Sequence, residues 1–328
     1  IHTLPELAEV KSVICRVTRP EGTVVLNADD PLVAAVAARV RAEVVLFSER
    51  GRGPRLRRHL ERGGRALLHE DGWLVEARGK RRRKVIAVDD IPATLGGLAR
   101  HNVANALAAA AGALALGFSN EQVAAGLRDF RISAELMPGR LNLYRRGNRL
   151  VVVDYAHNVA GLEVLLDTIE RLIGKRDRRH ATLSLIMGSA GDRPDDSLRA
   201  LATLAAQHAD EVAIKEDLPF LRGRSRESVI GELGAGLRAG GMNPHGVPIY
   251  ADEEAALRGE LTTDGRLAAD DGEKKHVLLE MVHAHREEVA EYLAGAGFKP
   301  ANDIADLADF RGRTARAQLT RRTRAGTR

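Results

Sequence analysis

The chain has 328 residues, 44% of them hydrophobic and 29% charged, which excludes a disordered or low-complexity protein and suits about two domains. No apolar stretch approaches the roughly 20 residues of a membrane span, and the first residues lack the pattern of a signal peptide. A single cysteine, Cys15, excludes an internal disulfide framework and is typical of a reducing cytoplasm. Because the first residue is Ile1 rather than Met, we expect a piece of a longer protein.

The net charge of +5 comes from one end of the chain. Residues 311–328 carry seven arginines and no acid, and without them the net charge becomes −2. This segment has no aromatic residues, which single-strand nucleic-acid binders interleave with basic ones. We therefore favour a disordered tail over an RNA- or polyanion-binding arm. A second basic run, from Arg78 to Lys84, is predicted to lie in an exposed loop.

The first elements along the chain alternate between helix and strand. A short helix is predicted over residues 5–15 and a β-branched strand over 23–27. Pro31 suits the first turn of the next helix, and Val44–Phe47 is a second buried strand. This strand–helix–strand order predicts a parallel sheet.

The next segment predicts an antiparallel edge to that sheet. Apolar runs at 66–69 and 73–76 flank Asp71-Gly72, a strong hairpin-turn signal. A third strand follows at 85–88, before Ile91-Pro92.

Two helices then lead to the predicted domain boundary. The alanine-rich helix over 101–116 is suited to close packing, and Ser119 with Gln122 forms a capping box for a helix over 122–130. Pro138-Gly139 marks the boundary.

Beyond residue 150 the alternation becomes regular, which predicts a doubly wound α/β domain with ligands at the carboxyl ends of its strands. The predicted strands are Leu150–Val153, Leu183–Met187, Val212–Lys215, Val247–Tyr250 and Val277–Met281. Neither half contains a Gly-rich phosphate loop of the GxxxxGK[ST] kind.

Three polar clusters are candidates for chemistry. Asn102 and Asn105 share one side of a helix start and could read the edge of an adenine, or merely cap and solvate that helix. Arg140, after Pro138-Gly139, could reach a phosphate or be an ordinary surface residue.

The third cluster follows the strand at 151–153, where Asp154, Tyr155, His157 and Asn158 stand together. A helix cap by Asn158 explains one or two of these polar groups but not four, so we favour a functional site.

In this order, the clusters resemble the Mur ligase family, and within it the cyanophycin synthetase branch. The matching segments are VLNADDP (25–31), HNVANALAA (101–109), PGRLN (138–142) and VVVDYAHN (151–158). Val159 departs from the family, which usually has proline there. The resemblance covers about residues 1–300. It implies part of a central ATP-binding domain at 1–136 without its P-loop, a Rossmann-like carboxyl-terminal domain at 137–300 and an Arg-rich tail at 301–328.

The resemblance also implies an ATP site. Asn102 and Asn105 would contact adenine, Asp154 the ribose, and Arg140 a phosphate, while Tyr155 and Asn158 would lie at the nucleotide. His157 would assist amine deprotonation or hold Asp154 in place, and we prefer the second role. Mg²⁺ would be a cofactor whose ligands precede residue 1.

Two further segments, GDRPDD (191–196) and IKEDLPFLRGR (214–224), favour the cyanophycin synthetase branch over muramyl ligases that carry an Asp-Asn-Pro-Arg signature. In that branch arginine is joined to the β-carboxylate of an aspartate-backbone polymer. A guanidinium substrate calls for carboxylates, and the arginines here could instead hold the acidic polymer. The candidates are Asp192, Arg193, Asp195, Asp196, Glu216, Asp217, Arg222 and Arg224.

The resemblance therefore implies a bacterial, cytoplasmic, ATP-dependent ligase that forms an amide through an acyl phosphate. Its partners would be arginine and a polymer primer rather than nucleic acid or membrane, and the full-length enzyme would be a homo-oligomer. Without a P-loop, we expect no ligation by this chain alone. The alternatives are another Mur-type ligase, such as a folylpolyglutamate or muramyl peptide synthetase, and a non-catalytic module that binds nucleotide or partners.

Overall fold

The computed structural model describes residues 3–174, 178–216, 218–262, 274–308 and 310. The chain divides into two compact units, Ile1–Phe130 and Arg131–Arg328. This division lies a few residues before Pro138-Gly139, where the sequence suggested a boundary. No helix in the described part of the chain is both long and apolar enough to cross a bilayer.

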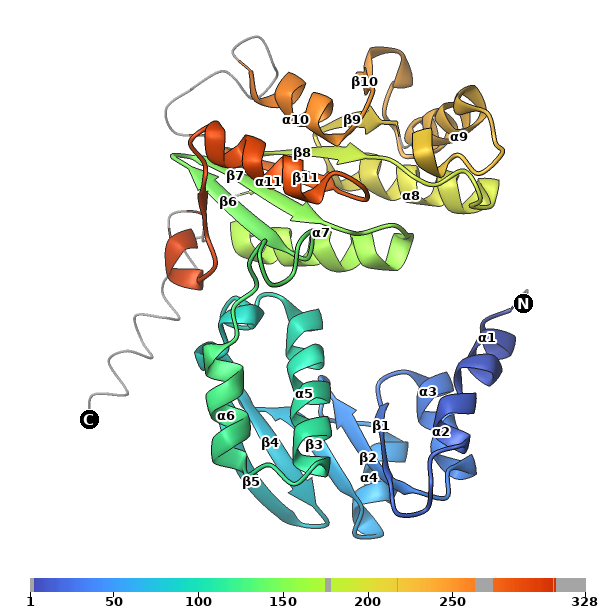
Figure 1. Ribbon diagram of the computed structural model, residues 1–328, viewed down its shortest axis with the longest axis vertical. Coiled ribbons are helices and arrows are strands. Elements are labelled where there is room, and N and C mark those ends of the chain that lie inside the picture. Colours follow the sequence, from blue (N-terminus) through green and yellow to red (C-terminus); the bar gives the residue numbers. More distant parts are fainter. Residues whose placement is uncertain (1–2, 175–177, 217, 263–273, 309, 311–328) are drawn as a thin grey trace. The chain divides into compact units, whose positions relative to one another are not determined.

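Unit 1 contains a five-stranded sheet in which the strands follow chain order (Figure 1). Its first three strands are parallel and the last two are antiparallel, as the sequence predicts. The strands are β1 (Thr23–Asn27), β2 (Glu43–Ser48), β3 (Arg65–Glu70), β4 (Trp73–Arg78) and β5 (Arg81–Ala87).

Helices cover both faces of this sheet. On one face, α5 and α6 pack against apolar side chains of β2 to β5, and on the other α3 and α4 pack against β1 to β3. The predicted capping box of Ser119 and Gln122 begins α6. The predicted helix over 5–15 is divided at Ser12, whose hydroxyl donates to the Glu9 carbonyl. The helices are α1 (Leu4–Lys11), α2 (Val13–Arg16), α3 (Pro31–Val36), α4 (Pro54–Glu61), α5 (Arg100–Ala115) and α6 (Asn120–Asp129).

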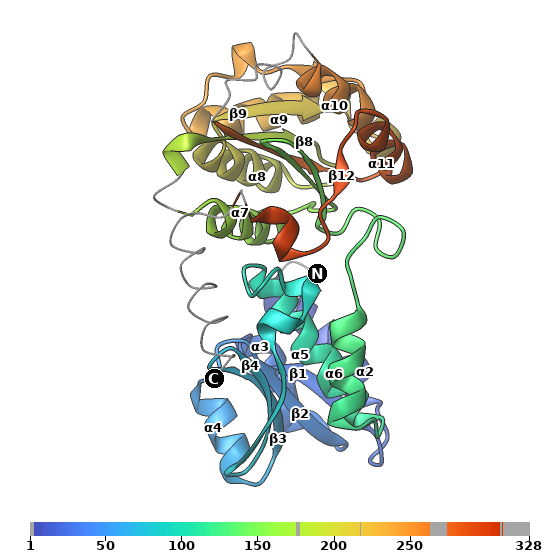
Figure 2. The ribbon, with the colours of Figure 1, turned by 90° about the vertical axis from the view of Figure 1, so that its left-hand side faces the viewer.

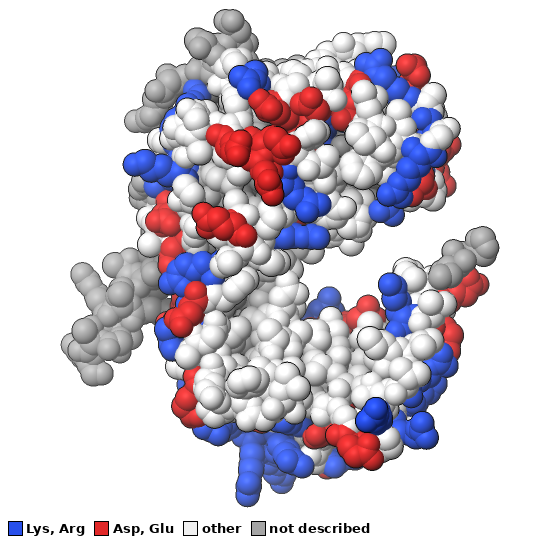
Figure 3. Space-filling model, in the orientation of Figure 1, with Lys and Arg blue, Asp and Glu red and all other residues white. Residues whose placement is uncertain are grey.

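The basic run from Arg78 to Lys84 is not a loop, as the sequence suggested, but the end of β4 and the first part of β5. β5 is the edge strand of the sheet, and its residues 81–84 are exposed. Figure 3 shows Lys and Arg side chains gathered along this edge. Charged side chains on an edge strand discourage pairing with another chain. This role explains the basic run, and no bound ligand is needed to account for it.

Unit 2 contains a seven-stranded sheet in the order β10-β9-β8-β11-β7-β6-β12. Five strands are parallel, and β6 and β12 form an antiparallel edge. All five predicted strands are present, but β6 and β12 were not predicted. The strands are β6 (Asn142–Arg146), β7 (Arg149–Asp154), β8 (Ala181–Met187), β9 (Glu211–Lys215), β10 (Ile249–Tyr250), β11 (Lys275–Met281) and β12 (Lys299–Pro300).

The helices of unit 2 form two layers around its sheet. Figures 1 and 2 show α7, α8 and α9 on one face and α10 and α11 on the other. Strand β11 lies between β7 and β8, so the carboxyl ends of these three strands meet at the centre of one edge. The helices are α7 (Val159–Ile173), α8 (Asp195–His208), α9 (Arg226–Ala239), α10 (Glu253–Leu261) and α11 (Arg286–Gly295).

The folded part of unit 2 continues past residue 300, where the sequence suggested a tail. Ala301, Leu307 and Phe310 are buried, and Asp303 with Asp306 forms a capping box for a short 3-10 helix at 304–307. These apolar side chains explain why the segment packs. The arginine-rich residues 311–328 lie outside the described residues.

Candidate functional site

The loop that contains Arg140 is bound to the carboxyl end of β7. The Gly139 carbonyl accepts from the Tyr155 N–H at 2.7 Å, and an Asp154 carboxylate oxygen accepts from the Leu141 N–H at 2.8 Å. Gly139 has φ +69°, and a Cβ there would lie 3.0 Å from a Val282 methyl, so the position needs glycine. Two sequence clusters that were predicted separately thus form one site.

Burial raises the pKa of Asp154 to about 6, although N–H donors from Leu141 and Ala156 and the charge of Arg140 oppose that shift. The carboxyl group is therefore mostly ionised at pH 7, while its charge is only partly compensated. A group of this kind is suited to accepting hydrogen bonds from a ligand's hydroxyl groups.

Two arginines lie over the Tyr155 ring. The Arg140 guanidinium is 4.6 Å and the Arg286 guanidinium 4.7 Å from its centroid. His283 meets the same ring edge-on at 5.5 Å. Two cations fixed on one aromatic ring make this edge of unit 2 attractive to an anion such as a phosphate.

His157 and Asn158 have local roles. Asn158 caps α7 by accepting from the Gly161 N–H at 2.8 Å, which is the structural alternative that its sequence position allowed. His157 Nδ1 lies 3.1 Å from the Tyr155 carbonyl oxygen and Nε2 3.3 Å from the Asn158 amide nitrogen. The hydrogen bonds of His157 thus stabilise the loop rather than hold Asp154 as we preferred, since Asp154 is bound by backbone N–H groups.

A buried charged cluster at the same edge was not predicted. Lys215, at the end of β9, is fully buried with Nζ 2.5 Å from Glu253 Oε1 and 3.1 Å from His283 Nδ1. The Glu253 carboxylate also accepts from the N–H groups of residues 283–285. It thereby holds the turn between β11 and α11.

The contacts of this cluster determine which ring nitrogen of His283 donates a hydrogen bond. A lysine ammonium can only donate, so Nδ1 accepts and the ring proton is on Nε2. Nε2 then donates to the Ala156 carbonyl at 2.9 Å. A continuous set of contacts therefore runs from β9 through Lys215 and His283 to the loop that carries Tyr155.

The pKa values of the two buried glutamates of this cluster are shifted in opposite directions. Burial opposes ionisation of Glu253, but Lys215 and the backbone donors outweigh it and lower its pKa. Burial raises the pKa of Glu280 well above its usual value, and neither of its carboxyl oxygens has a hydrogen-bond partner. The Lys215 ammonium thus pairs with the Glu253 carboxylate, whereas burial favours the protonated form of Glu280.

The predicted substrate residues after β8 and β9 lie in two touching loops. The Gly191 N–H donates to the Phe220 carbonyl at 2.9 Å, and a Cβ on Gly191 would collide with the Leu221 carbonyl. Three carboxylates in or beside these loops are paired with arginines of the same chain: Asp192 with Arg222, Asp195 with Arg224, and Glu216 with Arg226.

The remaining substrate candidates are less informative. Arg193 is exposed, and its carbonyl accepts from the Arg224 guanidinium at 3.2 Å. Asp196 is an exposed acid in the first turn of α8. Asp217 lies outside the described residues.

In unit 1, Asn102 and Asn105 face one another at the start of α5. The Asn102 amide donates to the Ala93 carbonyl at 2.9 Å, and its oxygen accepts from Asn105 at 3.1 Å. Neither residue caps the helix, because the N-cap position is Ala99, which has no side-chain hydrogen bond. Asn105 is exposed, whereas Asn102 is buried and joins α5 to the preceding turn.

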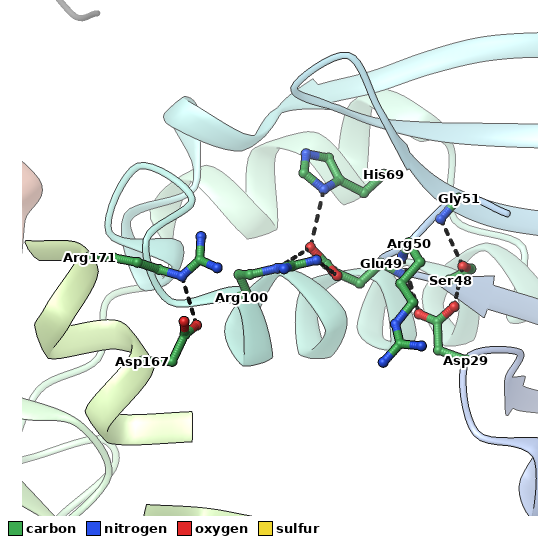
Figure 4. A network of polar contacts seen from close by, with 9 residues as sticks. All are labelled: Asp29, Ser48, Glu49, Arg50, Gly51, His69, Arg100, Asp167 and Arg171. Carbon is green, nitrogen blue, oxygen red and sulfur yellow. Dashed lines mark hydrogen bonds and ion pairs between the residues drawn. The ribbon is translucent and has the colours of Figure 1, made fainter. Parts of the chain in front are cut away.

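Polar side chains also gather where β1, β2 and β3 end (Figure 4). Asp29 accepts from the Ser48 hydroxyl at 2.6 Å and from the Glu49 N–H at 2.8 Å. Glu49 in turn pairs with Arg100 and lies 3.7 Å from His69. The Asp29 contacts explain the NADDP segment structurally, since they join the loops after β1 and β2.

The described residues do not form a magnesium site. Within the described ranges, no group of three or more His, Cys, Asp or Glu side chains is arranged to hold a metal ion.

Comparison with known proteins identifies a family that matches part of unit 2. Residues 139–266 match the family described as Mur ligase, glutamate ligase domain. Unit 2 contains a Mur ligase domain. A murein peptide ligase structure from Psychrobacter arcticus has the same fold, with a TM-score of 0.56 and 17% identity over 88% of this chain and 54% of that one.

Cyanophycin synthetases are similar in sequence to this chain over a length greater than either unit. The Synechocystis protein is 41% identical over 225 residues, which are 69% of this chain and 25% of that protein. The Nostoc protein is 38% identical over 228 residues, 70% of this chain and 24% of its own length. The chain thus spans about a quarter of the length of these relatives.

Proposed function

We propose that this chain is part of an ATP-dependent ligase of the cyanophycin synthetase type, which joins arginine to the β-carboxylate of an aspartate-backbone polymer. The observation that supports this most is the 41% identity over 225 residues, a length greater than either unit. Such similarity favours this branch over folylpolyglutamate or muramyl peptide synthetases.

In this proposal the residues of unit 2 bind the sugar and phosphates of ATP. The partly compensated Asp154 carboxylate accepts from the ribose hydroxyls, and Arg140, exposed and stacked on Tyr155, contacts a phosphate. In unit 1 the exposed Asn105 amide contacts adenine, and Asn102 orients it.

The reaction would have two steps. A substrate carboxylate oxygen attacks the γ-phosphorus of ATP, and ADP leaves. The arginine amine then attacks the acyl carbon, phosphate departs with the bonding electron pair, and the amine loses a proton. Arg140 stabilises the negative charge that develops on the phosphoryl oxygens. No step is assigned to magnesium, because the described residues do not form its site.

His157 serves in positioning rather than proton transfer in this scheme. A carbonyl only accepts, so Nδ1 carries the proton toward the Tyr155 oxygen, and Nε2 accepts from Asn158. Both ring nitrogens are therefore engaged within the loop.

Among the paired substrate candidates, Asp192 and Arg222 form the pair in which a substrate group can most readily replace one partner. Their side chains are 43% and 55% exposed, whereas Glu216 is 8% exposed in its pair with Arg226. A substrate guanidinium would replace Arg222 on Asp192, or a polymer carboxylate would replace Asp192 on Arg222.

The test is ADP release by the complete gene product that contains this chain, with an aspartate-rich primer and single amino acids. Arginine-dependent release that Arg140→Ala abolishes and Arg171→Ala leaves intact would support the proposal. Release that depends on glutamate or a diamino acid would favour another Mur ligase. Nucleotide binding without any amino-acid-dependent release would favour the non-catalytic module. The chain alone is expected to release no ADP.

A further inference from the structure

A basic groove lies at the other end of the unit 2 sheet, where β6 turns into β7 and β12 begins. Its volume is about 460 Å³, and its charged lining consists of Arg145, Arg146, Lys299 and Asp306. Arg146 pairs with Arg149, the first residue of β7, while Asp154 is the last. At about 3.3 Å per residue, the groove is roughly 17 Å from the Asp154 edge.

The two guanidinium groups of the groove are held in place. Arg145 lies 5.6 Å from the Phe310 ring centroid and donates to the Asp306 carbonyl at 2.8 Å. Arg146 lies 4.7 Å from the Phe298 centroid and donates to the Ala296 carbonyl at 2.5 Å. Because these contacts fix the side chains before any ligand arrives, little further rotamer entropy is lost on binding.

The lining of the groove contains three basic side chains and one acid. The only acid in its lining, Asp306, accepts from the Asp303 N–H in a capping box. Neither Arg146 nor Lys299 forms an ion pair with any residue in the described part of the chain. The sequence that follows Phe310 adds seven arginines and no acid.

We propose that this groove binds an acidic peptide segment through its side-chain carboxylates. A guanidinium fork matches the two oxygens of a carboxylate, and Lys299 adds a third cation. The aromatic rings beside the groove, Phe298 and Phe310, are covered by guanidinium groups and buried, so they offer no stacking surface for bases. These features favour an acidic peptide over a nucleic acid.

If the proposed function is correct, the acidic peptide is the aspartate-backbone primer. Only the identity of the peptide rests on the proposed function. A site remote from the Asp154 edge would keep the polymer bound between additions. An extended peptide advances about 3.3 Å per residue, so a primer of more than about five residues can span the distance between the groove and the Asp154 edge.

The test is the fluorescence anisotropy of labelled octa-aspartate with the whole chain at low salt, without ATP or arginine. We expect Arg146→Gln/Lys299→Gln to weaken binding at least about tenfold, since each charge-assisted contact is worth about that factor. Lys80→Gln/Arg81→Gln removes the same charge from the exposed edge of unit 1 and should leave binding unchanged. Lys299→Glu, at an exposed position, gives a second reading if the double variant folds poorly.

Three outcomes would overturn the proposal. Equal weakening in both double variants would show only general charge attraction. Retained binding in the groove variants, with loss on deletion of residues 311–328, would assign the peptide to that segment. Equally tight binding of an oligonucleotide of equal charge, abolished by the same groove substitutions, would indicate that the groove binds nucleic acid instead. Because no ligation is measured, these outcomes are independent of the proposed reaction.

Discussion

Replacing Lys215 by methionine tests whether the buried cluster of unit 2 holds its sheet edge together. Methionine has similar length and fills the same apolar surroundings, so the main change is the loss of an ammonium. Glu253, 1% exposed, would then keep its charge with only the N–H groups of residues 283–285 as partners.

The expected cost follows from that uncompensated charge. Removing one partner of a buried ion pair costs about 3–5 kcal/mol, and the three remaining donors place this case near 3 kcal/mol. Removing both charges in Lys215→Met/Glu253→Gln should recover part of that loss, because the amide oxygen can still accept from the N–H groups of residues 283 and 284, while the amide NH2 would face the N–H of residue 285. Arg171→Met breaks an exposed pair with Asp167 on α7 and should cost less than about 0.5 kcal/mol.

The assay must report on unit 2 separately. The single tryptophan, Trp73, lies in β4 of unit 1, so its fluorescence is an internal control whose midpoint should not move. Hydrogen exchange measured by mass spectrometry in peptides from β9 and β11 gives the stability of unit 2. A cost below about 1 kcal/mol for Lys215→Met, or a double variant no more stable than it, would refute the reasoning.

Four further outcomes are expected. Because the pKa of Asp154 is raised from 3.8 to about 6, unit 2 should lose about 2 kcal/mol of stability from this group as the pH rises from 4 to 7, and Asp154→Asn should lose none, as measured by urea unfolding at each pH. Nucleotide affinity of the complete protein, measured by calorimetry, should rise with pH through about 6 and lose this dependence in Asp154→Asn; an unchanged profile would contradict the ribose role. Arg140→Ala should weaken nucleotide binding about tenfold, and equal affinity would exclude a phosphate contact. Gly139→Ala should destabilise unit 2 by about 1–2 kcal/mol, whereas Gly147→Ala, with φ +58° but open space around it, should cost less; equal costs would mean that the contact with Val282 does not matter.

The sequence predicts the central strands of both sheets because these are continuous apolar runs that are buried on both faces. It does not predict β6, which ends in two arginines and lies next to the edge strand β12. The loop of Asp154 and Tyr155 was identified because its polar residues are adjacent in sequence.

The Lys215 cluster could not be found in that way. Its partners Glu253 and His283 are 38 and 68 residues further along the chain, and only the packing of β9, α10 and β11 brings them together. The one available signal was a lysine at the end of an apolar strand, where a buried charge requires a partner.

The position of β11 in the middle of the unit 2 sheet has a consequence for synthesis on the ribosome. Val151 of β7 pairs with Leu278, and Leu278 pairs with Ser184 of β8, so β7 and β8 are joined only through a strand made near the end of the chain. Until β11 emerges, the nascent polypeptide holds two separate half-sheets with unpaired inner edges. Unit 2 is therefore expected to fold late, and translational pausing just before residue 275 would prolong the interval in which it is prone to aggregate.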